Sequence, residues 1–302
     1  MLKLYFCIII LFYKMKYTEY LSFRIITELL RFCPFFMLYV LSDFICFILY
    51  DILAYRKNVV SENLKNSFPH KTEKEIKILC RKFYKHLADI TLESIKGMTI
   101  SEKAIKKRYV LKNTGIADEY YLRGISILCL TSHYGNWEYG ILATNNSIKH
   151  QTIALYLPLS NKHSENFSLK KRKRFGMKLV AVQETKTIFE KPLETPVAII
   201  MAADQSPSSI EKAIWVKFLN QDTACLHGPE AYAKKTNLPV LYLSIKKLKR
   251  GYYELVFEKL IDNPQDLEQG EITNIYMKRL EKDIIEKPDY YLWSHKRWKH
   301  KK

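Results

Sequence analysis

A histidine and a glutamate placed five residues apart could act as an acid–base pair in one short segment of this chain. His133 and Glu138 belong to the sequence TSHYGNWEYG at Thr131–Gly140, which directly follows an apolar run. On a single helix the two side chains would point about 140° apart, so a helix alone could not bring them together. A turn is favoured by Gly135 and Asn136. It would place His133 in a loop and Glu138 in the first turn of the next helix, so we expect the two to converge at the end of a strand.

Such a pair would supply general-base chemistry. A carboxylate beside one imidazole nitrogen fixes the tautomer and raises the basicity of the other nitrogen. His133 could then deprotonate a substrate hydroxyl without a protein nucleophile, with Glu138 orienting and polarising the ring. The alternative is a structural histidine beside a capped helix; the position at a strand end next to Gly-Asn-Trp favours catalysis. Asn136, inside this motif, is a further candidate for contact with substrate.

Two other segments could bind an anionic substrate. The run Lys170–Arg174 is entirely basic. Within it, Arg172 and Arg174 are candidates for binding a phosphate-bearing head group, because a guanidinium gives planar, bidentate contacts. A solvated helix face is the alternative explanation. Asp204 follows a predicted strand and is a candidate acceptor-site residue, although it could instead cap the turn before Pro207.

The elements that would position these residues alternate between strands and helices. This alternation predicts an α/β fold with a mixed, largely parallel sheet flanked by helices. In such open sheets ligands bind at the carboxyl ends of the strands, where His133 and Asp204 stand. The expected strands are 125–130, 152–157, 179–182, 197–202, 240–245 and 253–257, and the expected helices are 136–146, 164–175, 185–191, 228–236 and 271–286.

The N-terminal part of the chain is more apolar and lacks this alternation. Residues 4–13 are too few to cross a bilayer, whereas residues 34–50 carry a single charge, Asp43, and reach the lower limit of a membrane span. A buried core helix is the alternative, but the cations at the edges of the run favour a membrane-embedded or interfacial anchor. We therefore predict an N-terminal hydrophobic helical membrane anchor in residues 1–55 and one α/β domain in residues 56–302.

Composition restricts the class of partner. The chain has 302 residues, 49 Lys plus Arg against 31 Asp plus Glu, and a formal net charge of +18. Its 21 Tyr, 15 Phe and 4 Trp can fill a large core, which excludes disorder as the main state. So basic a chain suits an acidic partner, namely nucleic acid, an anionic membrane surface or an acidic carrier protein. The sequence has no helix-turn-helix, zinc-finger or ribonucleoprotein signature, so nucleic acid is not expected.

The cysteines and the C-terminal tail carry two smaller expectations. No two of the six cysteines stand at C-x-x-C spacing, which predicts buried, reduced thiols, with neither a metal centre nor a disulfide framework. In the tail, Trp293 and Trp298 stand among lysines and arginines, a composition suited to lipid headgroups. A frayed basic terminus is the alternative.

The segment from His133 to Glu138 resembles the H-x4-D/E motif of the late acyltransferases of lipid A biosynthesis, the lauroyl and myristoyl transferases, within the glycerolipid-type acyltransferases. The resemblance follows the family's order over residues 55–299. Two positions depart from it: Leu157 stands where a basic residue is frequent, and the Phe-Leu-Asn at 218–220 stands where Phe-Phe-Gly is common. The matching segments are Tyr55–Pro69, Arg174–Gly176, Ala203–Ser206, Trp215–Leu219, Gly228–Pro229 and Tyr290–Lys299.

The resemblance implies a membrane-associated O-acyltransferase that moves a fatty acyl chain from acyl carrier protein to a hydroxyl of a lipid A precursor or related glycolipid. It implies His133 as the general base and Glu138 as its orienting carboxylate. No metal or cofactor is implied, because the acyl-carrier-protein thioester is a co-substrate. The implied location is the cytoplasmic face of a bacterial inner membrane. Another glycolipid or an aminolipid as acceptor, or an inactive membrane interaction module, are the alternatives.

Overall fold

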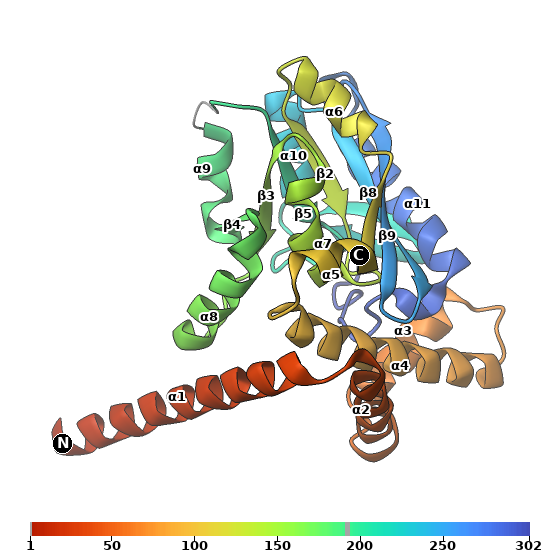
Figure 1. The fold of residues 1–302 in the computed structure, drawn as a ribbon. Coiled ribbons are helices and arrows are strands. Elements are labelled where there is room, and N and C mark those ends of the chain that lie inside the picture. The colour runs from red at the N-terminus through yellow and green to blue at the C-terminus, as the bar shows by residue number, and fades with distance from the viewer. Residues whose placement is uncertain (1, 191–193) are drawn as a thin grey trace.

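The structure is a computed structural model that describes residues 2–190 and 194–302, with residues 2–15 described as helical backbone alone. A central sheet flanked by helices forms the body, and two N-terminal helices lie beneath it (Figure 1). The helices are α1 (Leu2–Phe32), α2 (Phe35–Phe47), α3 (Lys57–Ser67), α4 (Glu73–Gly97), α5 (Glu102–Arg108), α6 (Gly115–Leu122), α7 (Trp137–Ala143), α8 (Lys162–Arg172), α9 (Thr185–Glu190), α10 (Gly228–Thr236) and α11 (Glu271–Glu286). The strands are β1 (Tyr109–Lys112), β2 (Ile127–Thr131), β3 (Gln151–Tyr156), β4 (Lys178–Ala181), β5 (Val197–Ala202), β6 (Ile214–Phe218), β7 (Gln221–Cys225), β8 (Val240–Lys249) and β9 (Tyr252–Ile261).

The main sheet has seven strands in the order β1-β9-β8-β2-β5-β3-β4. The strands from β8 to β4 in this order run parallel, whereas β9 is antiparallel to β8 and pairs in parallel with β1 at the edge. Every residue of β2 is buried, as expected for a central strand covered on both faces. The carboxyl end of β2 points toward α4 (Figure 1), and His86 of α4 contacts the turn that follows this strand.

The predicted fold class, an α/β fold with a mixed, largely parallel sheet, is confirmed. The six predicted strands are present as β2, β3, β4, β5, β8 and β9, and the five predicted helices as α7 to α11. The sequence pattern did not indicate the four-residue edge strand β1 or the β6–β7 hairpin. The sequences of the two hairpin strands, IWVKF and QDTAC, do not alternate apolar with polar residues, and the strands pair apart from the main sheet. The described cysteines are free, and the buried ones are Cys46, Cys80, Cys129 and Cys225.

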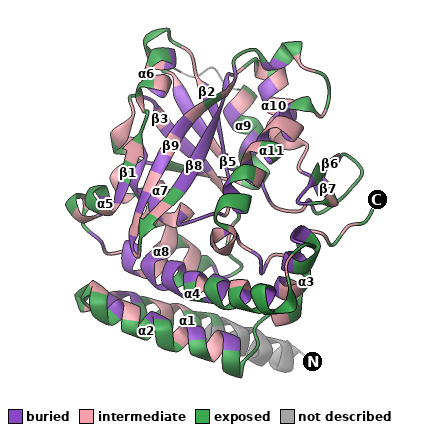
Figure 2. Cartoon of the chain, turned by 90° about the vertical axis from the view of Figure 1, so that its right-hand side faces the viewer, coloured by how far each residue is buried: buried purple, intermediate pink, exposed green. Residues whose placement is uncertain are grey.

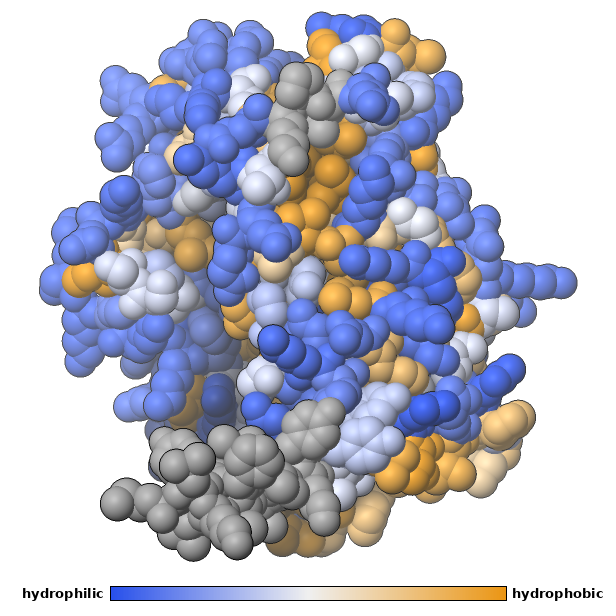
Figure 3. Space-filling model, turned by 90° about the vertical axis from the view of Figure 1, so that its left-hand side faces the viewer, coloured by the Kyte–Doolittle hydropathy of each residue, from blue (hydrophilic) through white to orange (hydrophobic). Residues whose placement is uncertain are grey.

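The apolar run predicted at residues 34–50 forms α2 and a π-helical turn, Ile48–Ile52, that continues it. Within the described residues, Phe35–Ile52 is the one helical stretch long and apolar enough to cross a membrane. Only 22% of it is buried, which does not fit the alternative of a core helix. Figure 2 shows α2 running alongside α4 at the base of the molecule, and Figure 3 shows hydrophobic side chains gathered along that base. The side chains of residues 4–13 lie outside the described part of the structure.

The C-terminal tail folds back onto the body, so the prediction that its tryptophans settle among lipid headgroups is wrong. Trp293 is 0% exposed, and its indole N–H donates to the carbonyl of Pro288. Trp298 stacks on Phe218 of the β6–β7 hairpin with 6.2 Å between ring centroids. The physical reason is that each indole has an aromatic partner inside the protein. Trp298 packs on Phe218 of the hairpin, which the sequence pattern did not indicate, and Trp293 packs against Phe68, with 5.9 Å between ring centroids.

Candidate active site

His133 lies in the turn after β2 and is held by Asp204. Its Nδ1 lies 2.8 Å from Oδ1 of Asp204, and the same oxygen accepts a hydrogen bond from the His133 backbone N–H at 3.1 Å. Asp204 follows β5, whose last residue, Ala202, pairs with Thr131 of β2, so neighbouring strand ends bring the two side chains together. Asp204 is 1% exposed and the His133 side chain 21%. The carboxylate keeps the proton on Nδ1 and leaves Nε2 as an acceptor, the tautomer that a general base requires.

The electrostatics of this pair favour the charged form of each partner. Burial alone lowers the pKa of His133, but the charge of Asp204, its hydrogen bond and the charge of Glu138 together raise that pKa above its ordinary value. Burial raises the pKa of Asp204, yet His133 and the positive charge of Arg297 hold it below its usual range. Asp204 therefore stays ionised near neutral pH. His133 becomes the neutral base only above its raised pKa.

Two residues near His133 were absent from the candidates predicted from sequence. The amide Nε2 of Gln205 lies 3.3 Å from Nε2 of His133 and can donate to it. Next along the chain, the Ser206 N–H donates to Nε2 of His295 at 3.1 Å. Burial and the positive charge of Arg297 lower the pKa of His295 to about 4, against the opposing charge of Asp204. In the sequence, Gln205 could have been identified by its position directly after Asp204 at a strand end. His295 could have been identified by its position in the terminal aromatic segment.

Glu138 lies in the first turn of α7, as predicted, but its partner in the structure is Arg172. The Arg172 Nε lies 3.1 Å from Oε2 of Glu138, and Nη2 donates to Oε1 at 3.2 Å. α7 carries Glu138 toward α8, so the carboxylate that hydrogen-bonds the His133 ring is Asp204. Glu138 acts on His133 through its charge. A direct orienting role of Glu138 in catalysis stays a prediction.

A groove of about 380 Å³ opens beside the Glu138–Arg172 pair. Trp137 lines it, and the ring of Trp137 meets the His133 imidazole edge-on with 5.1 Å between centroids. Leu157, at the end of β3, is 73% exposed at the groove wall. The other apolar lining comes from α1, α4, the β3 end and α8, as Phe23, Ile95, Met98, Tyr156, Leu159 and Leu169. This lining suits an apolar chain, and Arg172 and Glu138 give it one polar end.

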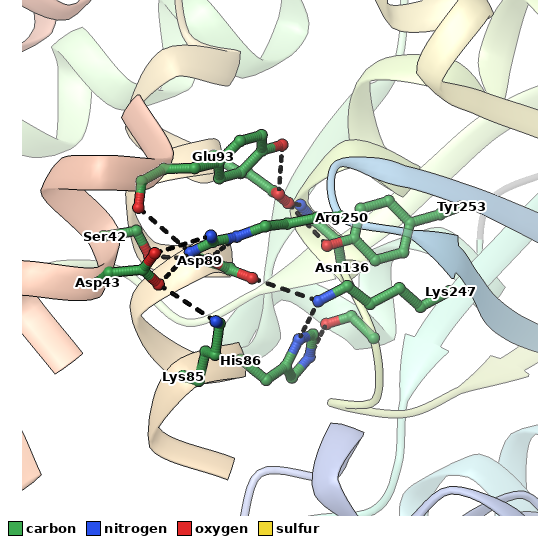
Figure 4. Close-up of polar contacts among 12 residues, drawn as sticks. Ser42, Asp43, Lys85, His86, Asp89, Glu93, Asn136, Lys247, Arg250 and Tyr253 are labelled. Carbon is green, nitrogen blue, oxygen red and sulfur yellow. Dashed lines mark hydrogen bonds and ion pairs between the residues drawn. The ribbon is translucent and has the colours of Figure 1, made fainter. Parts of the chain in front are cut away.

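Asn136, predicted to contact substrate, instead joins α7 to α4. Its Oδ1 accepts the Tyr139 N–H at 3.0 Å and caps α7, while its Nδ2 donates to Glu93 at 2.7 Å. Glu93 in turn accepts hydrogen bonds from the hydroxyls of Tyr39 and Tyr253 (Figure 4). With its side-chain amide engaged at both ends, Asn136 positions the turn that carries His133.

Arg174 is likewise engaged with the protein rather than with the groove. It lies over the ring of Phe175 and donates to backbone carbonyls at 2.6–2.7 Å, those of Lys171, Gly97 and Ile100. Of the two arginines predicted to bind an anionic head group, Arg172 lines the groove. Arg174 instead ties the end of α8 to the end of α4.

A histidine held by a buried carboxylate at the carboxyl ends of the strands of an α/β sheet, beside an apolar groove, is an arrangement that can activate a hydroxyl for reaction with an apolar substrate. The chain belongs to the bacterial lipid A biosynthesis acyltransferase family, whose model matches residues 12–300. The resemblance carried by the segment from His133 to Glu138 is thereby confirmed, and the protein is an acyltransferase. A comparison with curated proteins gave no match.

Proposed function

We propose that this acyltransferase moves a fatty acyl chain from acyl carrier protein to a hydroxyl of a lipid A precursor or a related glycolipid, with His133 as general base. The observation that carries the proposal is the buried Asp204 carboxylate on Nδ1 of His133, because it leaves Nε2 ready to accept a proton. Family membership supports the reaction class and a lipid A-type acceptor.

In the proposed reaction, Nε2 of His133 removes the proton of the acceptor hydroxyl as the hydroxyl oxygen attacks the thioester carbonyl carbon. The new C–O bond forms, the C–S bond then breaks, and the proton on Nε2 passes to the leaving thiolate, so His133 returns to its neutral state. Asp204 stabilises the imidazolium that exists between these steps. Gln205, with its amide 3.3 Å from Nε2, is close enough to donate a hydrogen bond to an oxygen of the substrate.

The groove and the charge of the chain support the proposed substrates. Its apolar walls suit a fatty acyl chain, and Arg172 at the groove suits a phosphate or carboxylate of the acceptor. The net charge of +18 suits two acidic partners, acyl carrier protein and an anionic membrane. Free, buried cysteines and an apolar N-terminal helix are consistent with the cytoplasmic face of an inner membrane.

An acyl-transfer assay tests the proposal. Purified membranes containing the chain are given a panel of acyl-carrier-protein thioesters of different chain lengths and a lipid A precursor, and products are identified by mass. We expect an acylated lipid A precursor. Thioester consumption that acylates only another glycolipid or an aminolipid would keep the reaction and change the acceptor. The absence of turnover with every thioester would contradict the proposal and favour an inactive interaction module.

A further inference from the structure

We infer that α1 and α2 lie flat on an anionic lipid bilayer, with α2 docked lengthwise on the body instead of crossing the membrane. This inference specifies the mode of the membrane attachment included in the proposed function, and it rests on that attachment. By length alone α2 and the π-helical turn that continues it could span a bilayer, because the 18 residues Phe35–Ile52 make a helix of about 27 Å. The contacts at the middle of this stretch exclude that arrangement.

Ser42 and Asp43 stand at the middle of the stretch and are bonded to the soluble body (Figure 4). The Ser42 hydroxyl donates to Oδ1 of Asp89 on α4 at 2.8 Å. Asp43 receives both terminal nitrogens of Arg250, at 2.7 and 3.1 Å, from the turn between β8 and β9. A helix crossing a bilayer would carry these groups to the hydrocarbon centre, where an ionised carboxylate and its partner are costly.

The contacts of α2 continue into the core of the body, so separating this helix from the body would cost free energy. Asp89 is 1% exposed and also binds Arg250, at 2.6 Å, and Lys247 of β8, at 3.3 Å. Pulling α2 away would remove the Ser42 hydrogen bond and open this buried cluster to solvent or lipid. His86 lies within reach of Lys247, at 3.4 Å, and contacts the carbonyl of Gly135, so the cluster also borders the turn that carries His133.

The junction between α1 and α2 is fixed to the body as well. The ammonium group of Lys96, on α4, donates to three backbone carbonyls at the end of α1, those of Leu30, Arg31 and Cys33, at 2.7–2.8 Å. Both helices therefore take their direction from α4. Figures 1 and 2 show α1 and α2 extending in different directions within one layer beneath the body.

The faces of this layer that turn away from the body are apolar. On α2 the exposed residues follow helical spacing on one side, as Phe36, Met37, Val40, Leu41, Phe44 and Phe47. On α1 the matching stripe is Leu21, Ile25, Ile26, Leu29 and Phe32. Apolar faces of this size on neighbouring helices require a covering, since water does not solvate them favourably.

Charge identifies the covering as an anionic bilayer. Exposed cations edge the apolar faces: Arg24 and Arg31 on α1, and Arg81 and Lys85 on α4, where they pair with acidic residues of the α2 stretch. A second copy of the chain would bring the same cations against these, and each copy carries a net charge of +18. An anionic lipid surface attracts them and covers the apolar faces at the same time.

The depth of α2 in a bilayer tests the inference. Spin labels are placed on the outward face by Phe36→Cys, Val40→Cys, Phe44→Cys and Phe47→Cys, each in a full-length Cys7→Ser/Cys33→Ser background whose remaining cysteines are buried. Depths are measured in vesicles of phosphatidylglycerol and phosphatidylethanolamine. We expect all four labels at one depth, about 5–10 Å below the headgroups. In a spanning helix the labels at 36 and 47 would instead differ by about 16 Å along the axis.

Leu122→Cys, on the exposed surface of α6 far from the base, is the matched control and should report water. The background protein without an added cysteine gives the labelling blank, and the circular dichroism of each variant checks its fold. A depth gradient across the four positions, or a chain that does not bind the vesicles, would overturn the inference. The depths are measured without substrate, so they test the position of α2 whether or not the acyl-transfer assay detects a product.

Discussion

Asp204, rather than the neighbouring Glu138, holds the imidazole of His133. A substitution of Asp204, and not of Glu138, is therefore the one expected to change the pKa of His133 most. The Oδ1 atom of Asp204 contacts both the ring Nδ1 and the backbone N–H of His133. Glu138 instead pairs with Arg172 at the groove. Asp204 is therefore the carboxylate expected to set the basicity of His133, and Arg172, the partner of Glu138, is the residue expected to contact substrate. Each expectation can be tested at a single residue.

Asp204→Asn should shift the pH dependence of activity. His133 must be neutral to act as a base, so kcat/KM falls as the pH drops through its pKa, which Asp204 raises. Removing the charge lowers that pKa, and the acid limb of the profile should move to lower pH. The rate at the plateau should fall about 10²-fold or more, because the amide no longer stabilises the imidazolium. An acid limb that stays in place would show that Asp204 does not set the basicity of His133.

Arg172→Gln and Arg174→Gln should separate two kinds of arginine. Arg172 lines the groove, so its loss should raise the KM for the acceptor more than it lowers kcat. Arg174 donates to backbone carbonyls, so its loss should lower the free energy of unfolding by about 1–3 kcal/mol. Steady-state kinetics and chemical denaturation measure the two effects. An unchanged KM for the acceptor in Arg172→Gln would show that Arg172 does not contact the acceptor and has a structural role alone.

At the scale of elements, the sequence was sufficient for six strands, β2 to β5, β8 and β9, and for the helices α7 to α11. It was not sufficient for β1, for the β6–β7 hairpin or for the contacts between elements. The apolar runs of β2 and β5 predicted two strand ends, and the parallel sheet then had to place His133 and Asp204 near each other. The partner of Glu138 could not be predicted, because it depends on how α8 packs on α7. The docking of the tail was missed because β6 and β7 gave no clear period.

Glu93→Ala should loosen the turn that carries His133. Glu93 is buried and accepts from Tyr39, Asn136 and Tyr253, so its removal leaves these donors without an acceptor. The free energy of unfolding should fall by about 1–3 kcal/mol, and kcat should fall with it. Glu93→Gln should recover most of both values, since the amide oxygen can accept from two donors and the Tyr39 hydroxyl can accept in return.

Glu102→Ala is the matched control for this substitution. Glu102 is a partly exposed residue of α5 that pairs with Lys106 and accepts a hydrogen bond from Asn146, so its loss should leave the free energy of unfolding close to that of the wild type. If Glu93→Ala and Glu102→Ala lowered the free energy of unfolding and kcat equally, the positioning role of Glu93 would be contradicted.

At the scale of the whole molecule, the proposed membrane attachment would use the charge and the apolar base on the same partner. The carboxyl end of β2 faces α4, and α1 and α2 cover the far side of that helix (Figures 1 and 2). Phe23 of α1 lines the groove. A lipid held at the base would therefore meet the groove close to His133.

Binding to anionic vesicles should weaken as salt is added. Each Lys or Arg near an anionic surface contributes about 1 kcal/mol, and raising the ionic strength from about 0.1 to 1 M shortens the screening length from about 10 to 3 Å. Co-sedimentation should show less bound protein at high salt, and less on neutral vesicles than on anionic ones. A bound fraction that does not respond to salt or to lipid charge would contradict the role given to the cations.

The most direct test of the central claim is the rate of acyl transfer by His133→Ala. The same acyl-carrier-protein thioester and acceptor are used for the variant and the wild type, and thermal unfolding shows whether both are folded. General-base catalysis by His133 predicts a fall of about 10²–10⁴-fold in kcat. A folded variant whose kcat stays within about threefold of wild type, far short of a general-base contribution, would contradict it.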